Sequence, residues 1–363
     1  MNKTAQILQD KVMSLIERGM HQPADDDEFD GLARAIFAFQ YQECAAYRAY
    51  CLQRDHTPDT VRHWTEIPAV PTRAFKNAAL ACFPTEDAAA VFHTSGTTTG
   101  RPGQHCLQNT ELYEAAIVPN FAAHLLPDGR GPLTMLVLTP SREESPHSSL
   151  SHMMACVIDR FGDGDSGYYV RQGTLRTDVL ADRLADAQRT GQPVFLLGTA
   201  FAFVHWFEYC LAHKLGFELP PGSRVMETGG FKGRAKAIPK RKLYALIEQA
   251  LHVPQTRIVD EYGMTELSTQ FYDQTMRAGS PTDWKTVPPW ARLRVIDPAT
   301  GEESPREHKG MIRIWDLANL WSVLCVQTED LGCRRGDGFE LLGRVADAEV
   351  RGCSLNAEFL SVT

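Results

Sequence analysis

Short apolar runs alternate with longer helical patterns through the middle of the chain, and this alternation restricts the possible folds more than any other feature. The runs LTMLVL, PVFLLG, SRVMET and TRIVDEYG begin at residues 133, 193, 223 and 256, and a helical pattern follows each of the first three. Parallel strands need crossover connections of this kind. We therefore expect residues 86–280 to form an α/β core built on a parallel sheet.

The sequence changes in character on both sides of this core. In residues 1–85, stretches such as FDGLARAIFAFQYQECAAYRAYCLQ carry apolar side chains at three- and four-residue spacing, which predicts a mostly helical segment packed on the core. Residues 281–346 hold short apolar runs between Gly, Pro and acidic turns, which predict a small β-rich subdomain. Residues 347–363 would form a hinge-like tail.

Charge and composition argue against several classes of protein. The net charge of −8 over 363 residues disfavours a general nucleic-acid binder, whose phosphate contacts need a basic face. No stretch of about 18 apolar residues could span a membrane, and the amino-terminal residues lack the apolar region of a secretory signal. The nine cysteines are scattered without a CxxC motif, which favours reduced thiols over a disulfide framework or a zinc site. We therefore expect a cytoplasmic protein.

A loop rich in hydroxyl groups follows the apolar run AAAVF. It reads HTSGTTTGRPGQH over residues 93–105, and eight of these thirteen residues are Ser, Thr or Gly. Backbone N–H groups of such a turn can bind one oxyanion, hydroxyl groups add neutral donors, and Arg101 adds a cation. The pattern is neither the Walker loop nor the dinucleotide fingerprint. It predicts a phosphate-binding loop between two strands, with a solvated surface loop as the alternative.

Four further segments place glycine or polar residues directly after apolar runs. In IVDEYGMTEL, Tyr262 and Glu266 follow a strand end, where parallel sheets bind ligands; Tyr can stack on a purine and Glu can bind Mg²⁺. The glycines of ETGGFKGR, residues 227–234, allow a flat ring to approach the backbone. Asp330 in VQTEDLG can accept hydrogen bonds from two ribose hydroxyls, and LLGRVADAEVRG ends a strand with Arg344.

These five segments, in this order, resemble the adenylate-forming enzymes, which include acyl-CoA synthetases, luciferase and peptide-synthetase adenylation domains. TSGTTTGRP is similar to their phosphate loop, EYGMTE to their Tyr-Gly-x-Thr-Glu motif, and GRVAD to the Gly-Arg-x-x-Asp at their hinge. QTEDLG resembles their ribose-binding Thr-Gly-Asp, with Glu329 in place of Gly. The resemblance covers about residues 90–350 and implies their large-domain fold with layered sheets. Only 16 residues follow Asp347, so we expect the usual lid domain and its catalytic Lys to be absent or vestigial.

The resemblance implies ATP and Mg²⁺ as cofactors and a role for individual residues. Glu266 would hold Mg²⁺ and Thr265 would lie near the α-phosphate. Tyr262 and a Gly-Gly-Phe turn would enclose the adenine, and Asp330 with Arg344 would fix the ribose. The implied nucleotide-binding residues are Thr94, Ser95, Gly96, Thr97, Thr98, Thr99, Gly100, Gly229, Gly230, Phe231, Tyr262, Gly263, Asp330 and Arg344. The candidates for the cation that replaces the lid Lys are Arg101, Lys232 and Arg234.

The short chain, its helical amino-terminal part and the sequence RGCSL together resemble the acyl-protein synthetases of bacterial bioluminescence, the LuxE type. In that family a Cys near the carboxyl terminus accepts the acyl group from the adenylate and passes it to a reductase partner. Cys353 matches this position, and the neighbouring Arg351 would lower the pKa of its thiol. The alternative is an inert Cys in a carboxyl-terminal strand.

Two helical segments supply candidates for binding the acid. His152 in SSLSHMMAC resembles the residue that related enzymes place at the mouth of the acyl pocket, although a His at the start of a partly buried helix fits equally well. The run TAFAFVHWFEYC is apolar nearly all round, which predicts a buried helix whose Phe201, Phe203 and Trp206 could also line an acyl pocket. No GxSxG motif is present, so a serine hydrolase is disfavoured.

The sequence therefore predicts an enzyme that activates a carboxylic acid, a fatty acid in the LuxE interpretation, as acyl-AMP and passes the acyl group to a thiol. The predicted catalytic residues are Cys353, Thr265, Arg101 and His152. The expected partner is an acyl-receiving protein, either reductase-like or a carrier. Two alternatives stay open: a ligase that uses CoA, a carrier protein or an amine with Cys353 idle, and a degenerate nucleotide-binding module without independent activity.

Overall fold

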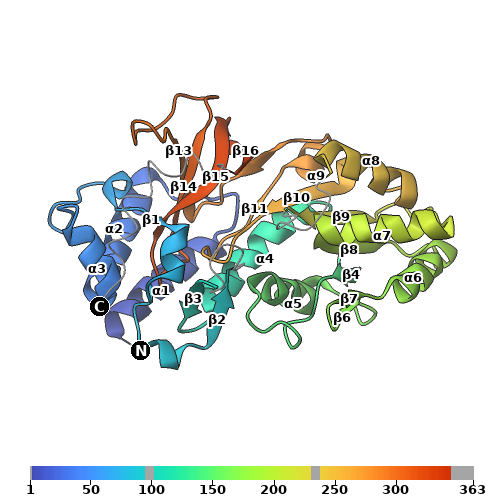
Figure 1. Cartoon of the computed structure of the whole chain (residues 1–363), viewed down its shortest axis with the longest axis horizontal. Coiled ribbons are helices and arrows are strands. Elements are labelled where there is room, and N and C mark those ends of the chain that lie inside the picture. The colour runs from blue at the N-terminus through green and yellow to red at the C-terminus, as the bar shows by residue number, and fades with distance from the viewer. Residues whose placement is uncertain (1, 95–101, 230–237, 345–363) are drawn as a thin grey trace. The chain divides into compact units, whose positions relative to one another are not determined.

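The structure is a computed structural model that describes residues 2–94, 102–229 and 238–344 (Figure 1). The chain forms two compact units. The first unit comprises residues 1–120, 264–271 and 283–363, and the second comprises residues 121–263 and 272–282. The four-part division by sequence regions stays a prediction, because both units combine stretches that are distant in the chain.

The second unit contains the predicted parallel sheet. Its strand order is β11-β10-β9-β8-β4-β5, and the pairs β4/β5, β4/β8, β8/β9 and β9/β10 are parallel. The strands are β4 (Thr134–Leu138), β5 (Gly167–Tyr168), β8 (Val194–Thr199), β9 (Arg224–Thr228), β10 (Ile258–Tyr262) and β11 (Phe271–Tyr272). The four apolar runs predicted to be parallel strands are β4, β8, β9 and β10, so the α/β prediction is confirmed.

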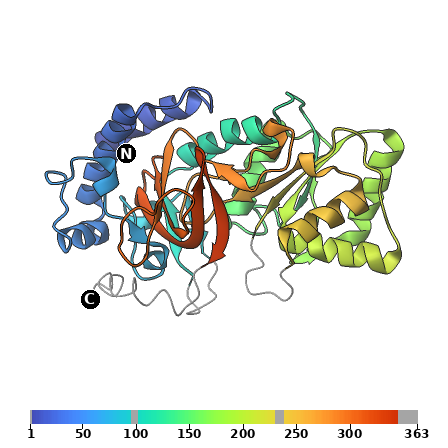
Figure 2. The ribbon, with the colours of Figure 1, turned by 90° about the horizontal axis from the view of Figure 1, so that it is seen from above.

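Helices cover both faces of this sheet (Figures 1 and 2). Leu136, Leu196 and Val225 face a buried cluster formed by α6, α7 and α8. On the opposite face, Phe195 contacts Phe121 of α4 at 5.7 Å between ring centroids. The helices are α4 (Glu111–Leu125), α5 (Ser149–Phe161), α6 (Thr177–Thr190), α7 (Ala200–His213), α8 (Lys240–Leu251) and the short α9 (Thr275–Ala278). Burial on two sides explains why the strands are continuous apolar runs instead of alternating patterns.

The connections of this sheet reverse direction at β4. From β4 the chain passes through α5 to β5 on one side, and it then returns through α6 to β8 on the other side. Parallel sheets bind ligands at the carboxyl ends of the strands next to such a reversal. At that end β4 and β8 lie very close together, because a Cβ on Gly198 would be 2.8 Å from the Cβ of Leu138.

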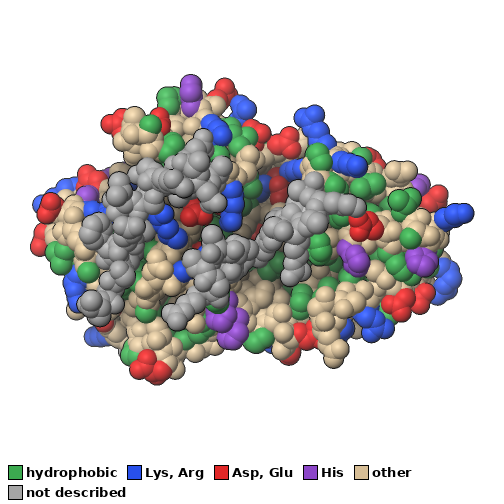
Figure 3. Space-filling model, in the orientation of Figure 1, with side chains coloured by type: hydrophobic (Ala, Val, Ile, Leu, Met, Phe, Trp, Pro, Cys, Tyr) green, Lys and Arg blue, Asp and Glu red, His purple; other side chains and the backbone are tan. Residues whose placement is uncertain are grey.

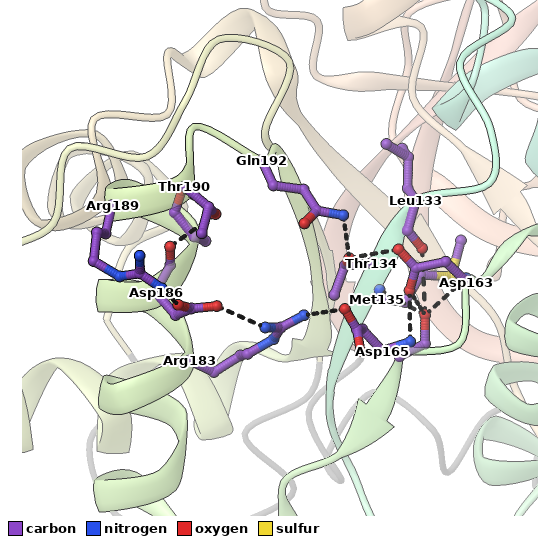
Figure 4. A network of polar contacts seen from close by, with 12 residues as sticks. Leu133, Thr134, Met135, Asp163, Asp165, Arg183, Asp186, Arg189, Thr190 and Gln192 are labelled. Atoms are coloured by element: carbon purple, nitrogen blue, oxygen red, sulfur yellow. Dashed lines mark hydrogen bonds and ion pairs between the residues drawn. The ribbon is translucent and has the colours of Figure 1, made fainter.

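A network of polar side chains links the opposite, amino-terminal ends of these strands (Figure 4). The Thr134 hydroxyl, at the start of β4, donates a hydrogen bond to Asp163 at 2.6 Å. Arg183 of α6 lies between Asp165 at 3.1 Å and Asp186 at 3.0 Å. The network therefore ties α6 to the turn before β5, away from the edge where a ligand is expected. The small hairpin β6 (Val170–Arg171) and β7 (Thr174–Leu175) and the turn η4 (Gln255–Arg257) complete this unit.

The first unit is built on an antiparallel sheet that matches the predicted β-rich part. Its strand order is β12-β16-β15-β14-β13, and β1 pairs in parallel with β15. The strands are β12 (Trp284–Thr286), β13 (Ala291–Ile296), β14 (Gly310–Asp316), β15 (Cys325–Arg335), β16 (Gly338–Arg344) and β1 (Val70–Pro71). The contribution of β1, from within the mostly helical amino-terminal part, was not predicted. A second, two-stranded sheet joins β2 (Ala90–His93) to β3 (Gln104–Leu107).

The predicted helical amino-terminal segment forms α1 (Lys3–Glu17), α2 (Asp26–Glu43), α3 (Ala45–Leu52) and the short turns η1 (Trp64–Glu66), η2 (Thr72–Lys76) and η3 (Thr85–Asp87). The fully buried Gln40 of α2 fixes this segment to the turn after β14. Its amide nitrogen donates to the carbonyl of Asn319 at 2.8 Å, and its amide oxygen accepts from the N–H of Leu324 at 2.8 Å. These bonds satisfy backbone groups that burial would otherwise leave unpaired.

The described surface carries side chains of both charges. On the face drawn in Figure 3, basic and acidic side chains are interspersed over the described surface, without a uniformly basic area. Among the described residues, no helix combines the length and the apolar character that a membrane crossing requires.

Candidate nucleotide-binding site

The hydroxyl-rich loop is carried by the hairpin β2–β3, as predicted. The ends of the loop are joined by two hydrogen bonds: the Thr94 N–H donates to the carbonyl of Gly103 at 2.9 Å, and the Gly103 N–H donates to the Thr94 hydroxyl oxygen at 2.8 Å. Gly103 allows a close approach here, since a Cβ would lie 3.0 Å from the Phe75 carbonyl and from the Thr94 hydroxyl. The predicted phosphate-binding residues Ser95, Gly96, Thr97, Thr98, Thr99, Gly100 and Arg101 lie outside the described residues.

Thr265, predicted to lie near the α-phosphate, is held against this hairpin. The Nδ1 atom of His105 on β3 donates to the Thr265 carbonyl at 2.7 Å. The Thr265 hydroxyl donates to the carbonyl of His93 on β2 at 3.3 Å. Both strands of the hairpin therefore contact the same residue of the Tyr-Gly-x-Thr-Glu motif. No sequence motif predicted the His105 contact.

The predicted metal and ribose residues gather in the first unit. Arg344, the last residue of β16, lies opposite Asp330 of β15, and its Nε donates to the Asp330 carboxylate at 2.9 Å. Burial raises the pKa of Glu266 to about 7; the charge of Arg344 lowers it, and the charges of Asp330 and Glu329 raise it. Glu266, Glu329, Asp330 and Arg344 therefore share one electrostatic environment.

This cluster carries more negative than positive charge. Among the described residues, the carboxylates of Glu266, Glu329 and Asp330 share the guanidinium of Arg344, and burial disfavours the ionised form of Glu266. A divalent cation would relieve that cost. Among the described residues, no group of three or more His, Cys, Asp and Glu side chains could hold a metal by itself. The arrangement suits Mg²⁺, which binds through one or two carboxylates together with substrate phosphates.

Asn319 and Asp316, which no sequence motif indicated, hold the residues at and after the end of the Tyr-Gly-x-Thr-Glu motif by hydrogen bonds. The Asn319 amide nitrogen donates to the Glu266 carbonyl at 2.8 Å, and its amide oxygen accepts from the Ser268 hydroxyl at 2.6 Å. The Asp316 carboxylate accepts from the Ser268 N–H at 2.9 Å and from the Thr269 hydroxyl at 2.8 Å. Burial raises the pKa of Asp316 to about 6. Their signal in the sequence is the pair of polar residues inside the apolar segment IWDLANLW.

In the second unit, the two predicted adenine-binding segments follow neighbouring strands. Thr228, the last residue of β9, pairs with Glu261 of β10, so Gly229 and Tyr262 lie at the same end of the sheet. The Tyr262 side chain is buried. Gly263 directly follows β10. The remaining residues of the glycine-rich turn, Gly230, Phe231, Lys232 and Arg234, lie outside the described residues.

A charged cluster that the sequence did not indicate lies beside these strand ends. Lys240 of α8 contacts the Asp260 carboxylate at 3.0 Å, and the Tyr244 hydroxyl donates to Glu227 at 3.3 Å. Burial by itself would lower the pKa of Lys240, but the carboxylates of Asp260 and Asp273 raise it. The cluster therefore keeps a charged lysine near the ends of β9 and β10.

The candidates for acid binding occupy helices of the second unit. Phe203 and Trp206 are fully buried in the cluster between α7 and the sheet, and Trp206 stacks on Phe217. Phe201 and His152 are half-buried. The buried helix is as predicted, while an acyl pocket and a role for His152 stay predictions.

Cys353, together with Arg351 and Asp347, lies outside the described residues. The eight described cysteines form no disulfide. Burial raises the pKa of seven of their thiols, those of Cys44, Cys51, Cys82, Cys106, Cys210, Cys325 and Cys333. A thiol with a raised pKa is a poor nucleophile, because the thiolate is the reactive form.

Solved structures define the class to which this fold belongs, the adenylate-forming ligases. A 2-hydroxyisobutyryl-CoA ligase in its postadenylation state, with 2-HIB-AMP, matches with a TM-score of 0.67 at 15% identity, over 91% of this chain and 70% of that one. The luciferase-like enzyme of the mealworm Zophobas morio matches with a TM-score of 0.51 at 15% identity, over 73% of this chain and 59% of that one.

Within that class, the chain belongs to the acyl-protein synthetase (LuxE) family, whose model matches residues 24–359. The long-chain-fatty-acid–luciferin-component ligases of Aliivibrio fischeri and Vibrio harveyi are each 21% identical to it. The matches cover 90% of this chain and 87% and 86% of those proteins. The resemblance drawn from the five motifs is confirmed, and so is the prediction of an acid-activating ligase.

Proposed function

We propose that this protein forms an acyl-AMP from a fatty acid and ATP and then transfers the acyl group to Cys353. A carboxylate oxygen of the acid attacks the α-phosphorus of ATP, and pyrophosphate leaves. The Cys353 thiolate then attacks the acyl carbonyl carbon, and AMP leaves. The observation that carries the proposal is the gathering, in one unit, of the phosphate-loop hairpin, Thr265, Glu266, Asp330 and Arg344.

The residues of this unit supply mainly positioning and charge, which is what phosphoryl transfer needs. Glu266 would hold Mg²⁺, which would neutralise charge on the phosphates. Asp330 would accept hydrogen bonds from the ribose hydroxyls, with Arg344 fixing its carboxylate. In the second unit, Tyr262 and the turn that begins at Gly229 would enclose the adenine.

A long-chain fatty acid is the proposed substrate. The support comes from the names of the Aliivibrio fischeri and Vibrio harveyi relatives, which are long-chain-fatty-acid ligases. On helix α7, the side chain of Phe201 is partly buried and those of Phe203 and Trp206 are fully buried. These aromatic side chains would form an apolar wall for the fatty acid.

Cys353 is the proposed acyl acceptor before a partner protein, either a reductase or a carrier, receives the group. Burial raises the pKa of seven of the eight described thiols, which disfavours them as nucleophiles. The scattered cysteines without a CxxC motif also fit the proposed location in the cytoplasm, where thiols stay reduced.

The deciding experiment is ATP–pyrophosphate exchange with a panel of saturated acids of increasing chain length, followed by labelling with radioactive acid. We expect the rate of exchange to be highest with long-chain acids. We also expect the protein to carry a labelled acyl group in a thioester, which neutral hydroxylamine cleaves. Cys353→Ser should keep the exchange and lose the label. A Cys353→Ser variant that still forms product from CoA or a carrier would favour a ligase with Cys353 idle. The absence of exchange with every acid, even with added partner proteins, would leave a nucleotide-binding module.

A further inference from the structure

His105 is a fully buried side chain that points from β3 to the main chain of the Tyr-Gly-x-Thr-Glu motif. Its Nδ1 lies 2.7 Å from the Thr265 carbonyl oxygen, which can only accept, so Nδ1 carries the hydrogen. Burial lowers the pKa of His105 to about 4, so the ring is neutral near pH 7 and Nε2 is unprotonated. Nε2 makes no hydrogen bond with any residue that the structure describes.

The ring is held in this orientation by its surroundings. The Phe75 ring meets it edge-on, with 5.9 Å between centroids and an interplanar angle of 86°. Phe75 also lies against the loop end, because a Cβ on Gly103 would be only 3.0 Å from the Phe75 carbonyl. The position of His105 is therefore coupled to that of the residue that closes the loop.

The contact with Thr265 is made twice, once from each strand of the hairpin. His105 on β3 binds the Thr265 carbonyl, and the Thr265 hydroxyl binds the carbonyl of His93 on β2. His93 directly precedes Thr94, which bonds to Gly103 across the base of the loop. The base of the hydroxyl-rich loop and Thr265 therefore form one hydrogen-bonded assembly.

The next residue of the motif is fixed from another direction. Asn319 donates to the Glu266 carbonyl, so two consecutive carbonyls are bound by two buried side chains from separate parts of the first unit. This arrangement determines the distance between the loop and the Glu266 side chain. A loop that holds phosphates and a carboxylate that holds their metal ion must keep such a fixed distance, because both act on the same triphosphate.

We infer that His105 is a positioning residue for adenylate formation, which donates from Nδ1 to the Thr265 carbonyl and so fixes the base of the hydroxyl-rich loop relative to Glu266. It acts through Thr265 and does not touch the nucleotide or the acid. The inference rests on the proposed function, since the loop and Glu266 are the groups that would bind the triphosphate and its metal.

Three substitutions test this role in the full-length protein. His105→Asn places an amide nitrogen close to the position of Nδ1, His105→Gln places it close to that of Nε2, and His105→Phe keeps the ring without a donor. In ATP–pyrophosphate exchange we expect His105→Asn to stay within about threefold of the wild-type kcat. His105→Gln and His105→Phe should lower kcat about 10- to 100-fold, with little change in the KM for the acid.

A matched control separates positioning from loss of stability. His124 is also fully buried, on α4 in the second unit, and is remote in sequence from every motif. His124→Phe should lower the melting temperature but keep the wild-type kcat at temperatures well below that melting point. His105→Phe and His124→Phe are therefore compared at one temperature at which both are folded, as checked by circular dichroism.

The outcomes distinguish the inference from the proposed function. If the wild-type protein catalyses exchange and folded His105→Phe has the same kcat, the positioning role is overturned and the proposed function stays intact. Equal losses in His105→Asn and His105→Gln would also overturn it, because the donor at Nδ1 would then not matter. A wild-type protein that supports no exchange would overturn the proposed function, and the inference with it.

Discussion

Burial acts on two ionisable side chains of the candidate site in opposite directions. It lowers the pKa of His105 to about 4 and raises the pKa of Glu266 to about 7, and in each case it favours the neutral form. For His105 the hydrogen bond to the Thr265 carbonyl alone would raise the pKa, but burial outweighs it, and the neutral ring leaves no unpaired hydrogen on Nε2. For Glu266 the neutral form cannot bind a cation. The same physical effect therefore keeps His105 neutral near pH 7 and opposes the proposed chemistry at Glu266.

The low pKa of His105 predicts a loss of stability in acid. The unfolded chain binds a proton at His105 below pH about 6.5, and the folded chain does so only below about 4. As the pH falls through this window, the free energy of unfolding should decrease by about 3 kcal/mol relative to that of His105→Asn. Urea unfolding of both proteins between pH 4 and 7.5 measures the difference, and parallel pH curves would contradict the prediction.

Glu266→Gln should weaken activity while strengthening the fold. The amide cannot replace the carboxylate as a ligand, so we expect ATP–pyrophosphate exchange to fall about 100-fold or more. A buried acid with a raised pKa destabilises the folded state as the pH rises from about 4.5 to about 7, so its removal should add about 1–3 kcal/mol of stability at pH 8. Glu329→Gln, which removes a neighbouring charge, is the control. An equal loss of exchange in Glu329→Gln would indicate a general charge effect.

Sequence motifs predicted the residues whose chemistry is visible locally and missed those whose role depends on distant contacts. Glu266, Asp330 and Arg344 each follow or end an apolar run, so their positions were predictable, although their roles stay predictions. His105 and Asn319 act on backbone carbonyls 160 and 53 residues away in the chain. No spacing rule relates residues that meet only after the sheets have formed.

Secondary-structure elements show the same division between local and distant causes. The strands β4, β8, β9 and β10 were predictable because a strand buried on both faces is an apolar run. The two-residue strand β1 was not, since it exists only through its pairing with β15. Helix α1 precedes residue 24, where the match to the family model begins, yet its apolar side is buried in the structure.

The buried Gln9 connects α1 to the start of α4. Its amide nitrogen donates to Glu111 at 2.5 Å, and its amide oxygen accepts from Asn109 at 2.9 Å. Gln9→Ala should lower the free energy of unfolding by about 1–3 kcal/mol, because it removes the hydrogen bonds to both Glu111 and Asn109. Gln6→Ala removes from the same helix a half-buried side chain with an exposed hydrogen bond to Asp10, and it should change stability by less than about 0.5 kcal/mol. Chemical denaturation measures both, and similar values would argue against a structural role for the Gln9 contacts.

At the scale of the whole molecule, each compact unit has its own sheet and its own buried side chains. In the second unit the fully buried Arg224 is paired with Asp128, with two nitrogen–oxygen distances of 3.0 and 2.9 Å. The sequence predicted an α/β core and a β-rich part, but it did not predict which segments of the chain combine into each compact unit. Compactness depends on which segments pack together, and residues 264–271 pack with segments far from them in the chain.

Asp128→Ala should affect one unit selectively. It leaves a buried guanidinium without its carboxylate, which costs about 3 kcal/mol. We expect faster hydrogen–deuterium exchange in peptides from residues 121–263 and unchanged exchange in the strands β13–β16. Arg142→Ala, which breaks an exposed ion pair with Glu143, should change neither. Uniformly faster exchange throughout the chain would mean that the two units unfold together.

The pairing of β1 with β15 affects how the protein folds during its synthesis. Val70 pairs with Val326, so 256 residues must be added after β1 has been made before its partner exists. At typical ribosome speeds this delay is about 10–50 s. Meanwhile residues 121–263, which form most of the second unit, are completed first. The amino-terminal helices must therefore wait with exposed apolar surface, and the nascent chain should depend on chaperones that bind such surfaces until the last strands emerge.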